Sequence, residues 1–315
     1  MPRGSLATLE ISEISHCRRH RLRTAYNNYV SLRVINVMYL GRVDYSTALN
    51  LQNTLVHLVK AGRAGHTLLL LEHPPVITLG RNAGMQNIIA SRDFLTNRGI
   101  ELFETDRGGD VTFHGLGQLV GYPIFDLRAF DPRIGAVDFV RKIEESLIRT
   151  CGDLGVVTTR ISGLTGVWTE DKPPAKIAAI GVHISRAVTS HGFALNVTTN
   201  LDYFKLIVPC GISDKPVTSL AAEMARSSIS NQKQPPTLEQ MAEMVSRSFG
   251  RVFEAQTLWL ESLDSLLADL APSPVSPSSV SPAPLPNGPP ANQDTPARAP
   301  ENIRRLAHEE DIYLA

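Results

Sequence analysis

The chain has 315 residues, and its 31 Lys and Arg balance 31 Asp and Glu, which gives a formal net charge of zero. Such a chain has no overall field that would hold it on nucleic acid or an anionic membrane, and no apolar run approaches the roughly 18–20 residues that span a bilayer. Hydrophobic residues make up 43% of the sequence, which supports a large core and excludes wholesale disorder.

The first thirty residues differ in composition from the rest. They contain five Arg against two Glu, and an Arg-rich, acid-poor start is typical of a mitochondrial transit peptide. A basic leader without regular structure explains the same composition equally well, because the two Glu and the lack of a clear amphipathic period weaken the transit-peptide interpretation. In either case, we expect residues 1–30 to lie outside the folded domain.

Residues 31–270 carry the periodic patterns of a folded domain. Apolar positions at helical spacing predict helices over 45–59 and 137–154, which Gly62 and Gly155 end, and a capping box at 237–240 predicts a third helix. Apolar runs of strand length lie at 32–39, 67–71, 75–79, 119–125, 167–168, 177–184 and 193–197. Strands outnumber helices without a strict βαβ alternation, so we expect one α+β domain, a mixed sheet flanked by helices.

The C-terminal segment is rich in proline. Ten of the 21 prolines fall between Pro272 and Pro300, where almost no large apolar side chains could offset the entropy of ordering. We therefore predict a Pro/Ser-rich disordered tail over residues 271–315. A short helix or a weak docking contact of the last fifteen residues is the alternative.

The segment RGGDVTFHGLGQ, residues 107–118, concentrates glycine beside polar side chains. Four glycines in twelve residues favour neither a helix nor a strand, and they suit a loop whose backbone amides approach a ligand. Arg107, Thr112, His114 and Gln118 would add side-chain donors. The segment matches neither the P-loop nor the GxGxxG pattern. A tight hairpin connection is the alternative to a binding loop.

The three cysteines have no CxxC spacing, which argues against a disulfide framework and a cysteine metal site. Cys151 lies on the apolar face of a predicted helix and is expected to pack as a small hydrophobe. Cys210 lies between Pro and Gly, on a turn that can expose its sulfur, although an inert thiol is the alternative. A reactive thiol needs a neighbouring cation or base. The candidates are Lys176, which would otherwise end its strand in solvent, and His114, His183 and His191.

Five blocks of this sequence together resemble the lipoyl(octanoyl) transferase family. They are LLLLEHPPVITLGR (68–81), RGGDVTFHGLGQLVGYP (107–123), TGVW (165–168) followed by AKIAAIGV (175–182), HGFALNV (191–197) and VPCGI (208–212). The second block has Leu116 where the family has Pro. The resemblance covers about residues 32–225, and it implies the fold of the biotin and lipoate protein ligase catalytic domain.

The resemblance also implies an activity and its residues. Enzymes of this family move an octanoyl group from acyl carrier protein to a lysine of lipoyl domains, as in the glycine cleavage H protein and 2-oxoacid dehydrogenase subunits. Cys210 corresponds to the nucleophile that forms the acyl thioester, and Lys176 to the lysine that lowers its pKa. No ATP, metal or other cofactor is implied. The implied acyl-binding residues are Arg107, Gly108, Gly109, Asp110, Val111, Thr112, Phe113, His114, Ala179, Ile180, Gly181, Gly192, Phe193 and Ala194.

Two alternatives differ from this assignment in chemistry. An ATP-dependent lipoate or biotin ligase would need nucleotide-binding elements and no nucleophilic Cys. A non-catalytic acyl-binding protein of the same fold would need neither Cys210 nor Lys176. Carrier and lipoyl domains of a eukaryotic cell meet in mitochondria, so together with the basic leader we expect a mitochondrial location.

Overall fold

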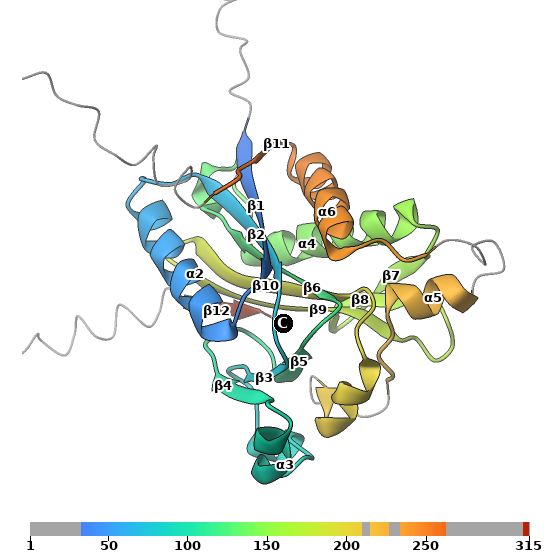
Figure 1. Cartoon of the computed structure of the whole chain (residues 1–315). Helices are drawn as coiled ribbons and strands as arrows, with labels where there is room; N and C mark the ends of the chain where they lie inside the picture. The colour runs from blue at the N-terminus through green and yellow to red at the C-terminus, as the bar shows by residue number, and fades with distance from the viewer. Residues whose placement is uncertain (1–32, 210–214, 227–233, 263–310, 315) are drawn as a thin grey trace, which may run out of the picture.

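The computed structural model describes residues 33–209, 215–226 and 234–262 and the backbone of 311–314 (Figure 1). The predicted leader, Cys17 and Cys210 lie outside the described residues. Within the described part of the chain, no helix is long and apolar enough to cross a membrane.

A mixed sheet forms the centre of the described structure. Its strands run in the order β11-β1-β2-β6-β10-β9-β8-β7, with β12 paired to β9. β1 pairs in parallel with β11 and β2, and the other pairs are antiparallel. The mixed sheet was predicted from the sequence. The strands are β1 (Val34–Arg42), β2 (His66–Glu72), β6 (Gln118–Ile124), β7 (Thr158–Ile161), β8 (Leu164–Thr169), β9 (Lys176–Ser185), β10 (Val188–Asn196) and β11 (Gln256–Trp259).

Helices pack on both faces of this sheet (Figure 1). α4 (Ala136–Asp153) and α6 (Leu238–Phe253) share one apolar cluster with the sheet, in which the rings of Phe125, Phe139, Phe249 and Phe253 are in contact. α2 (Tyr45–Lys60) packs on the other face, and α5 (Leu220–Arg226) is a short helix near the end of β8. The predicted capping box of α6 is present.

A second, three-stranded sheet has the order β4-β3-β5. It consists of β3 (Val76–Leu79), β4 (Glu101–Glu104) and β5 (Val111–His114), and α3 (Arg92–Asn97) packs beside it (Figure 1). β5 lies inside the glycine-rich segment, so the prediction that residues 107–118 contain no strand was wrong. The glycines flank a short alternating stretch in which Val111 and Phe113 enter the core of the small sheet, and this period of two stabilises a strand.

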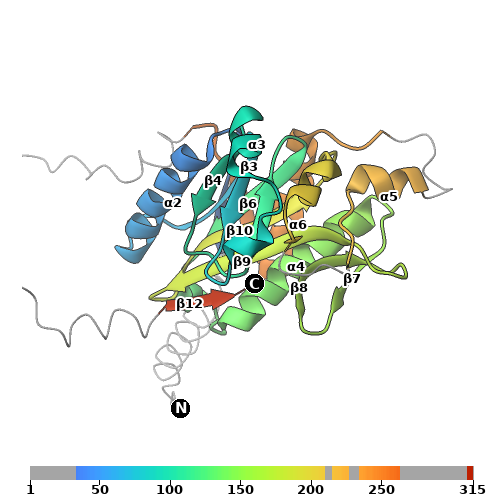
Figure 2. The same cartoon turned by 90° about the horizontal axis from the view of Figure 1, so that it is seen from below.

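The C-terminal end of the chain also forms a strand. β12 (Asp311–Leu314) pairs antiparallel with Val182–Ser185 of β9 (Figure 2). The predicted disorder of residues 271–315 is therefore wrong for these four residues, where the docking alternative applies; residues 271–310 lie outside the described residues. β8 pairs only with the first part of β9, so the second part has an open edge, and an open edge binds a further strand.

Candidate active site

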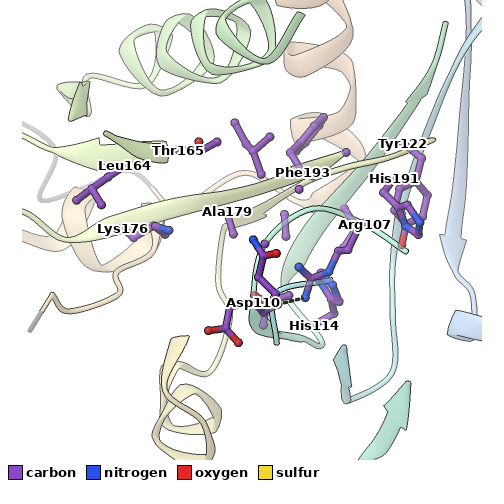
Figure 3. A pocket seen from close by; sticks show the side chains of 18 of the residues that line it. Arg107, Asp110, His114, Tyr122, Leu164, Thr165, Lys176, Ala179, His191 and Phe193 are labelled. Atoms are coloured by element: carbon purple, nitrogen blue, oxygen red, sulfur yellow. Dashed lines mark hydrogen bonds between the residues drawn. The ribbon is translucent and has the colours of Figure 1, made fainter. Parts of the chain in front are cut away.

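A cavity of about 330 Å³ lies between the large sheet and the loop that joins β4 to β5 of the small sheet (Figure 3). Its floor is the face of β9 and β10 where Ala179 pairs with Ala194 and Gly181 with Gly192. A Cβ atom at Gly181 would lie 2.6 Å from the carbonyl oxygen of Gly108. The missing side chain at 181 therefore lets the loop rest on the sheet, whereas the small side chains at 179 and 194 leave room for a ligand.

Arg107 holds the loop that covers the cavity. Its buried guanidinium donates to the carbonyl oxygens of Thr78 (2.8 Å), Asp110 (2.7 Å) and Gly108 (2.9 Å) and to the hydroxyl of Thr78. The loop amide at Gly108 donates to the carbonyl of Val182 on β9. These hydrogen bonds give Arg107 a role in shaping the loop, where the sequence had indicated a donor to a ligand.

His114 and Gln118 are likewise engaged with the protein. His114 Nδ1 lies 2.8 Å from Gln118 Oε1, and Gln118 Nε2 donates to the carbonyl of Phe113 and to Asn196 Oδ1. Burial lowers the pKa of His114 to about 3, so its ring is neutral at pH 7 and Nδ1–H donates to Gln118. This network joins the glycine-rich segment to the end of β10.

Lys176 is the first residue of β9, and its side chain faces the cavity (Figure 3). The residue is only 7% exposed, so the interpretation that it ends the strand in solvent was wrong. Its Nζ lies 4.7 Å from the centroid of the Trp168 ring, a cation–π distance. A Cβ at Gly166 would lie 3.4 Å from Lys176 Cε, so this glycine makes room for the lysine chain.

Both ends of the segment that contains Cys210 adjoin Lys176. The amide of Lys176 donates to Pro216 O (2.8 Å), and its carbonyl accepts from Thr218 N (2.9 Å). On the other side, Pro209 borders a small cavity together with Lys176 and Val217.

Asp106 binds two of the histidines considered as neighbours of Cys210. Its carboxylate lies 2.7 Å from His183 Nδ1 and 2.7 Å from His191 Nε2. These hydrogen bonds hold the pKa of Asp106 far below its usual range, and burial lowers the pKa of His191. His191 is therefore neutral at pH 7 and donates Nε2–H. Of the four candidates, Lys176 is left as the amine that faces the cavity next to the Cys210 segment.

Eleven of the fourteen predicted acyl-binding residues line the cavity. Val111 and Phe113 alternate away from it into the core of the small sheet, and the backbone of Gly108 contacts Gly181 and Val182 of β9. Their predicted contact with the acyl group therefore does not fit this cavity, while binding by the others stays a prediction. The lining residues that were not predicted are Tyr45, Asn82, Val120, Tyr122, Gly163, Leu164, Thr165 and His191.

Some of these omissions had a signal in the sequence. Tyr122 and Thr165 belong to the blocks on which the family resemblance rests, and His191 begins one of them. Tyr45 was predicted only as part of the apolar face of a helix. Its position at the cavity depends on how α2 packs against the small sheet, where its ring lies 5.0 Å from that of Phe103, and a local pattern does not contain that contact.

Cys151 is the cysteine that the structure describes. It is fully buried on α4, and burial raises the pKa of its thiol to about 12. The prediction that it packs as a small hydrophobe is confirmed. Across the described residues, no group of three or more His, Cys, Asp or Glu side chains could hold a metal ion.

Residues 44–250 match the family model of the lipoyl protein ligase A/B catalytic domain. The chain belongs to this family. Its relatives include an octanoyltransferase of Koribacter versatilis, which is 60% identical over 281 residues, 89% of this chain and 100% of that protein. An octanoyltransferase of Acidobacterium capsulatum is 56% identical over 249 residues, 76% of this chain and 98% of that protein. The family resemblance found in the sequence is thereby confirmed.

Solved structures share the fold at low sequence identity. A bi-partite lipoate protein ligase of Thermoplasma acidophilum has a TM-score of 0.54 and 17% identity, covering 76% of this chain and 92% of that chain. A lipoate-protein ligase A bound with ATP has a TM-score of 0.54 and 16% identity, covering 75% and 93%. These likenesses confirm the predicted fold class and carry nothing further about activity.

Proposed function

We propose that the protein transfers an octanoyl group from acyl carrier protein to a lysine of a lipoyl domain, through a thioester on Cys210. The observation that carries the mechanism is Lys176, an amine buried at one end of a cavity with a floor of small residues and adjoined by both flanks of the Cys210 segment. The octanoyltransferase relatives support the transfer itself.

The first step exchanges one thioester for another. The Cys210 thiolate attacks the acyl carbonyl, the bond to the phosphopantetheine sulfur breaks, and the leaving thiolate takes a proton from the Lys176 ammonium, which becomes neutral. The exchange is nearly isoenergetic and needs no ATP. An ammonium at Lys176 beside Cys210 would stabilise the attacking thiolate by Coulomb attraction.

The second step forms the amide. The amine of the acceptor lysine attacks the Cys210 thioester, its proton passes to neutral Lys176, and the Cys210 thiolate leaves. The amide is more stable than the thioester, so this step is downhill. Acyl methylenes over Ala179 and Ala194 would each contribute about 0.8 kcal/mol of binding.

An ATP-dependent ligase is the remaining alternative on this fold, since solved structures with the fold include a lipoate-protein ligase A bound with ATP. A ligase makes no use of a thiol beside a buried lysine. ATP dependence therefore separates the two functions directly.

The experiment uses the full-length protein with octanoyl-acyl carrier protein and no ATP. Mass spectrometry should find an octanoyl adduct on Cys210, absent from Cys210→Ala and present in the matched control Cys151→Ala. The adduct should pass to a lipoyl domain added afterwards. An adduct that survives Cys210→Ala, or transfer that starts only when ATP is added, would contradict the mechanism.

We also propose the mitochondrial location and the eukaryotic lipoyl acceptors as the place and partners of this reaction. The support is the basic composition of residues 1–30; the relatives reported above come from bacteria and add none. Fluorescence imaging of the full chain and of a form without residues 1–30 tests the location. Mitochondrial import that persists without these residues contradicts the leader.

A further inference from the structure

His191 departs from the geometry of the strand that carries it. On β10, Gly192 and Ala194 face the cavity, so regular alternation would point the His191 ring to the opposite face of the sheet. Instead, its backbone has φ of 55°, in the left-handed region, and its ring lines the cavity. A residue other than glycine adopts this conformation only where its surroundings enforce it, and such residues cluster at ligand sites.

Two hydrogen bonds hold His191 in this conformation. Phe193 of β10 pairs with Gly121 of β6, so His191, two residues earlier, lies opposite Pro123. Proline has no N–H and cannot donate a hydrogen bond to the neighbouring strand. The amide of His191 donates instead to Oε1 of Gln52 on α2 (2.8 Å), and its ring donates to Asp106 (2.7 Å). Gln52 is itself buried, so its hydrogen bond fixes the backbone of His191, while Asp106 fixes the ring.

The ring lies at the opposite end of the cavity from Lys176 (Figure 3). His191 pairs with Val182, six residues beyond Lys176 on β9, which is about 20 Å at about 3.3 Å per residue. The side chains of Lys176 and His191 occupy part of this length. An extended octanoyl chain has seven C–C bonds of about 1.5 Å and is about 9 Å long. This length is comparable with the distance left between the side chains of Lys176 and His191.

The covering loop also meets the sheet at this end. Asp106 directly precedes Arg107, and the amide of Gly108 donates to Val182. The second oxygen of Asp106 binds His183, which does not line the cavity. The His191 ring is thus held between the loop and the sheet at this end of the cavity, where Tyr122 lies beside it (Figure 3).

We propose that His191 is the specificity-determining residue that sets the longest acyl chain this protein accepts, with Gln52 and Asp106 as the residues that position it. The proposal rests on the proposed octanoyl transfer. It deepens that function by assigning the length limit to one side chain, because carbons beyond the eighth would have to occupy the volume of the ring.

The test is a competition between two donors in one tube. Full-length protein is mixed with equal amounts of octanoyl- and decanoyl-acyl carrier protein, and the two Cys210 adducts are counted by mass spectrometry. Their ratio gives the ratio of kcat/KM values and does not depend on how much of a variant is folded. Each buried methylene is worth about fourfold, so His191→Ala should raise the decanoyl preference about fifteenfold.

Two further variants complete the test. His191→Asn shortens the side chain with a residue that tolerates positive φ, so it serves if His191→Ala folds poorly, and it should also raise the ratio. His183→Asn changes the other partner of Asp106 without enlarging the cavity, and its ratio should match that of the wild type.

An unchanged ratio in both His191 variants, or an equal rise in His183→Asn, would overturn the proposal while octanoyl transfer still stands. If the wild-type protein forms no adduct with either donor, the proposed function fails, and the assignment of His191 to an acyl chain fails with it.

Discussion

Glu144 is a fully buried carboxylate on α4, and its removal should destabilise the protein. Oε1 accepts the amide of Gly166 (3.1 Å), and Oε2 binds Arg141 (2.6 Å) and Arg160 (3.0 Å). The side chains of the two Arg are 45% and 34% exposed, so water can solvate them after the change and they add little to its cost. The buried amide of Gly166 has no such replacement, and leaving it unsatisfied costs about 1–3 kcal/mol.

We therefore expect Glu144→Ala to lower the free energy of unfolding by about 2–3 kcal/mol. For a domain of this size, about 2–4 °C is lost per kcal/mol, which is about 4–12 °C in Tm. Glu144→Gln keeps an oxygen for Gly166 and should lose about 1 kcal/mol.

Urea unfolding and thermal scans measure these changes. Glu145→Ala is the matched control, because this neighbouring carboxylate pairs with Arg149 and Arg160 near the surface, where such pairs contribute about 0–1 kcal/mol. The reasoning is refuted if Glu144→Gln is as unstable as Glu144→Ala, or if Glu145→Ala matches either.

Three other predictions concern the site and the titrating groups. Lys176→Met should slow adduct formation on Cys210 about 100-fold at pH 7 and recover partly at pH 9, where the thiol ionises without a neighbouring ammonium; an equal loss at both pH values would exclude this role. His66 packs between Phe125 and Phe130, and burial lowers its pKa to about 4. As the pH falls below 6.5, His66 takes up a proton in the unfolded state but not yet in the folded state, so the free energy of unfolding falls until about pH 4. His66→Phe should reduce this fall, seen by urea unfolding, by about 1.4 kcal/mol per pH unit, and an unchanged slope would contradict the assignment. Because burial raises its thiol pKa to about 12, Cys151 should resist maleimide at pH 8 until the chain unfolds; rapid labelling in the native state would show that it is accessible.

Local signals predicted much of the fold correctly. The helix limits near Gly155 and at the capping box of Thr237 and Gln240 depend on a few neighbouring residues, so the sequence contains them. β5 was missed because glycines on both sides of residues 111–114 hide a short strand whose partner, β3, is more than thirty residues away. β12 depends on where β8 stops pairing with β9, which is a property of the assembled sheet.

Some features of the site could likewise be predicted from the sequence, and others could not. Lys176 and most of the small residues on β9 and β10 follow from motif position. The direction of the His191 ring does not, because it results from Pro123 on a neighbouring strand and Gln52 on a distant helix. Two of the three histidines considered as activators of Cys210 are bound to Asp106, a contact that spacing along the chain does not indicate.

The position of β11 beside β1 has a consequence for biosynthesis. The first described strand has β11, more than 200 residues later, as its outer parallel partner, and Arg33 donates to the carbonyl of Phe253, 220 residues later (Figure 1). On the ribosome, the outer edge of β1 therefore stays uncovered until residue 259 has been made. Unpaired strand edges are where nascent chains aggregate. Chains that stop before β11 should accordingly collect in the insoluble fraction, while the full chain closes its own edge.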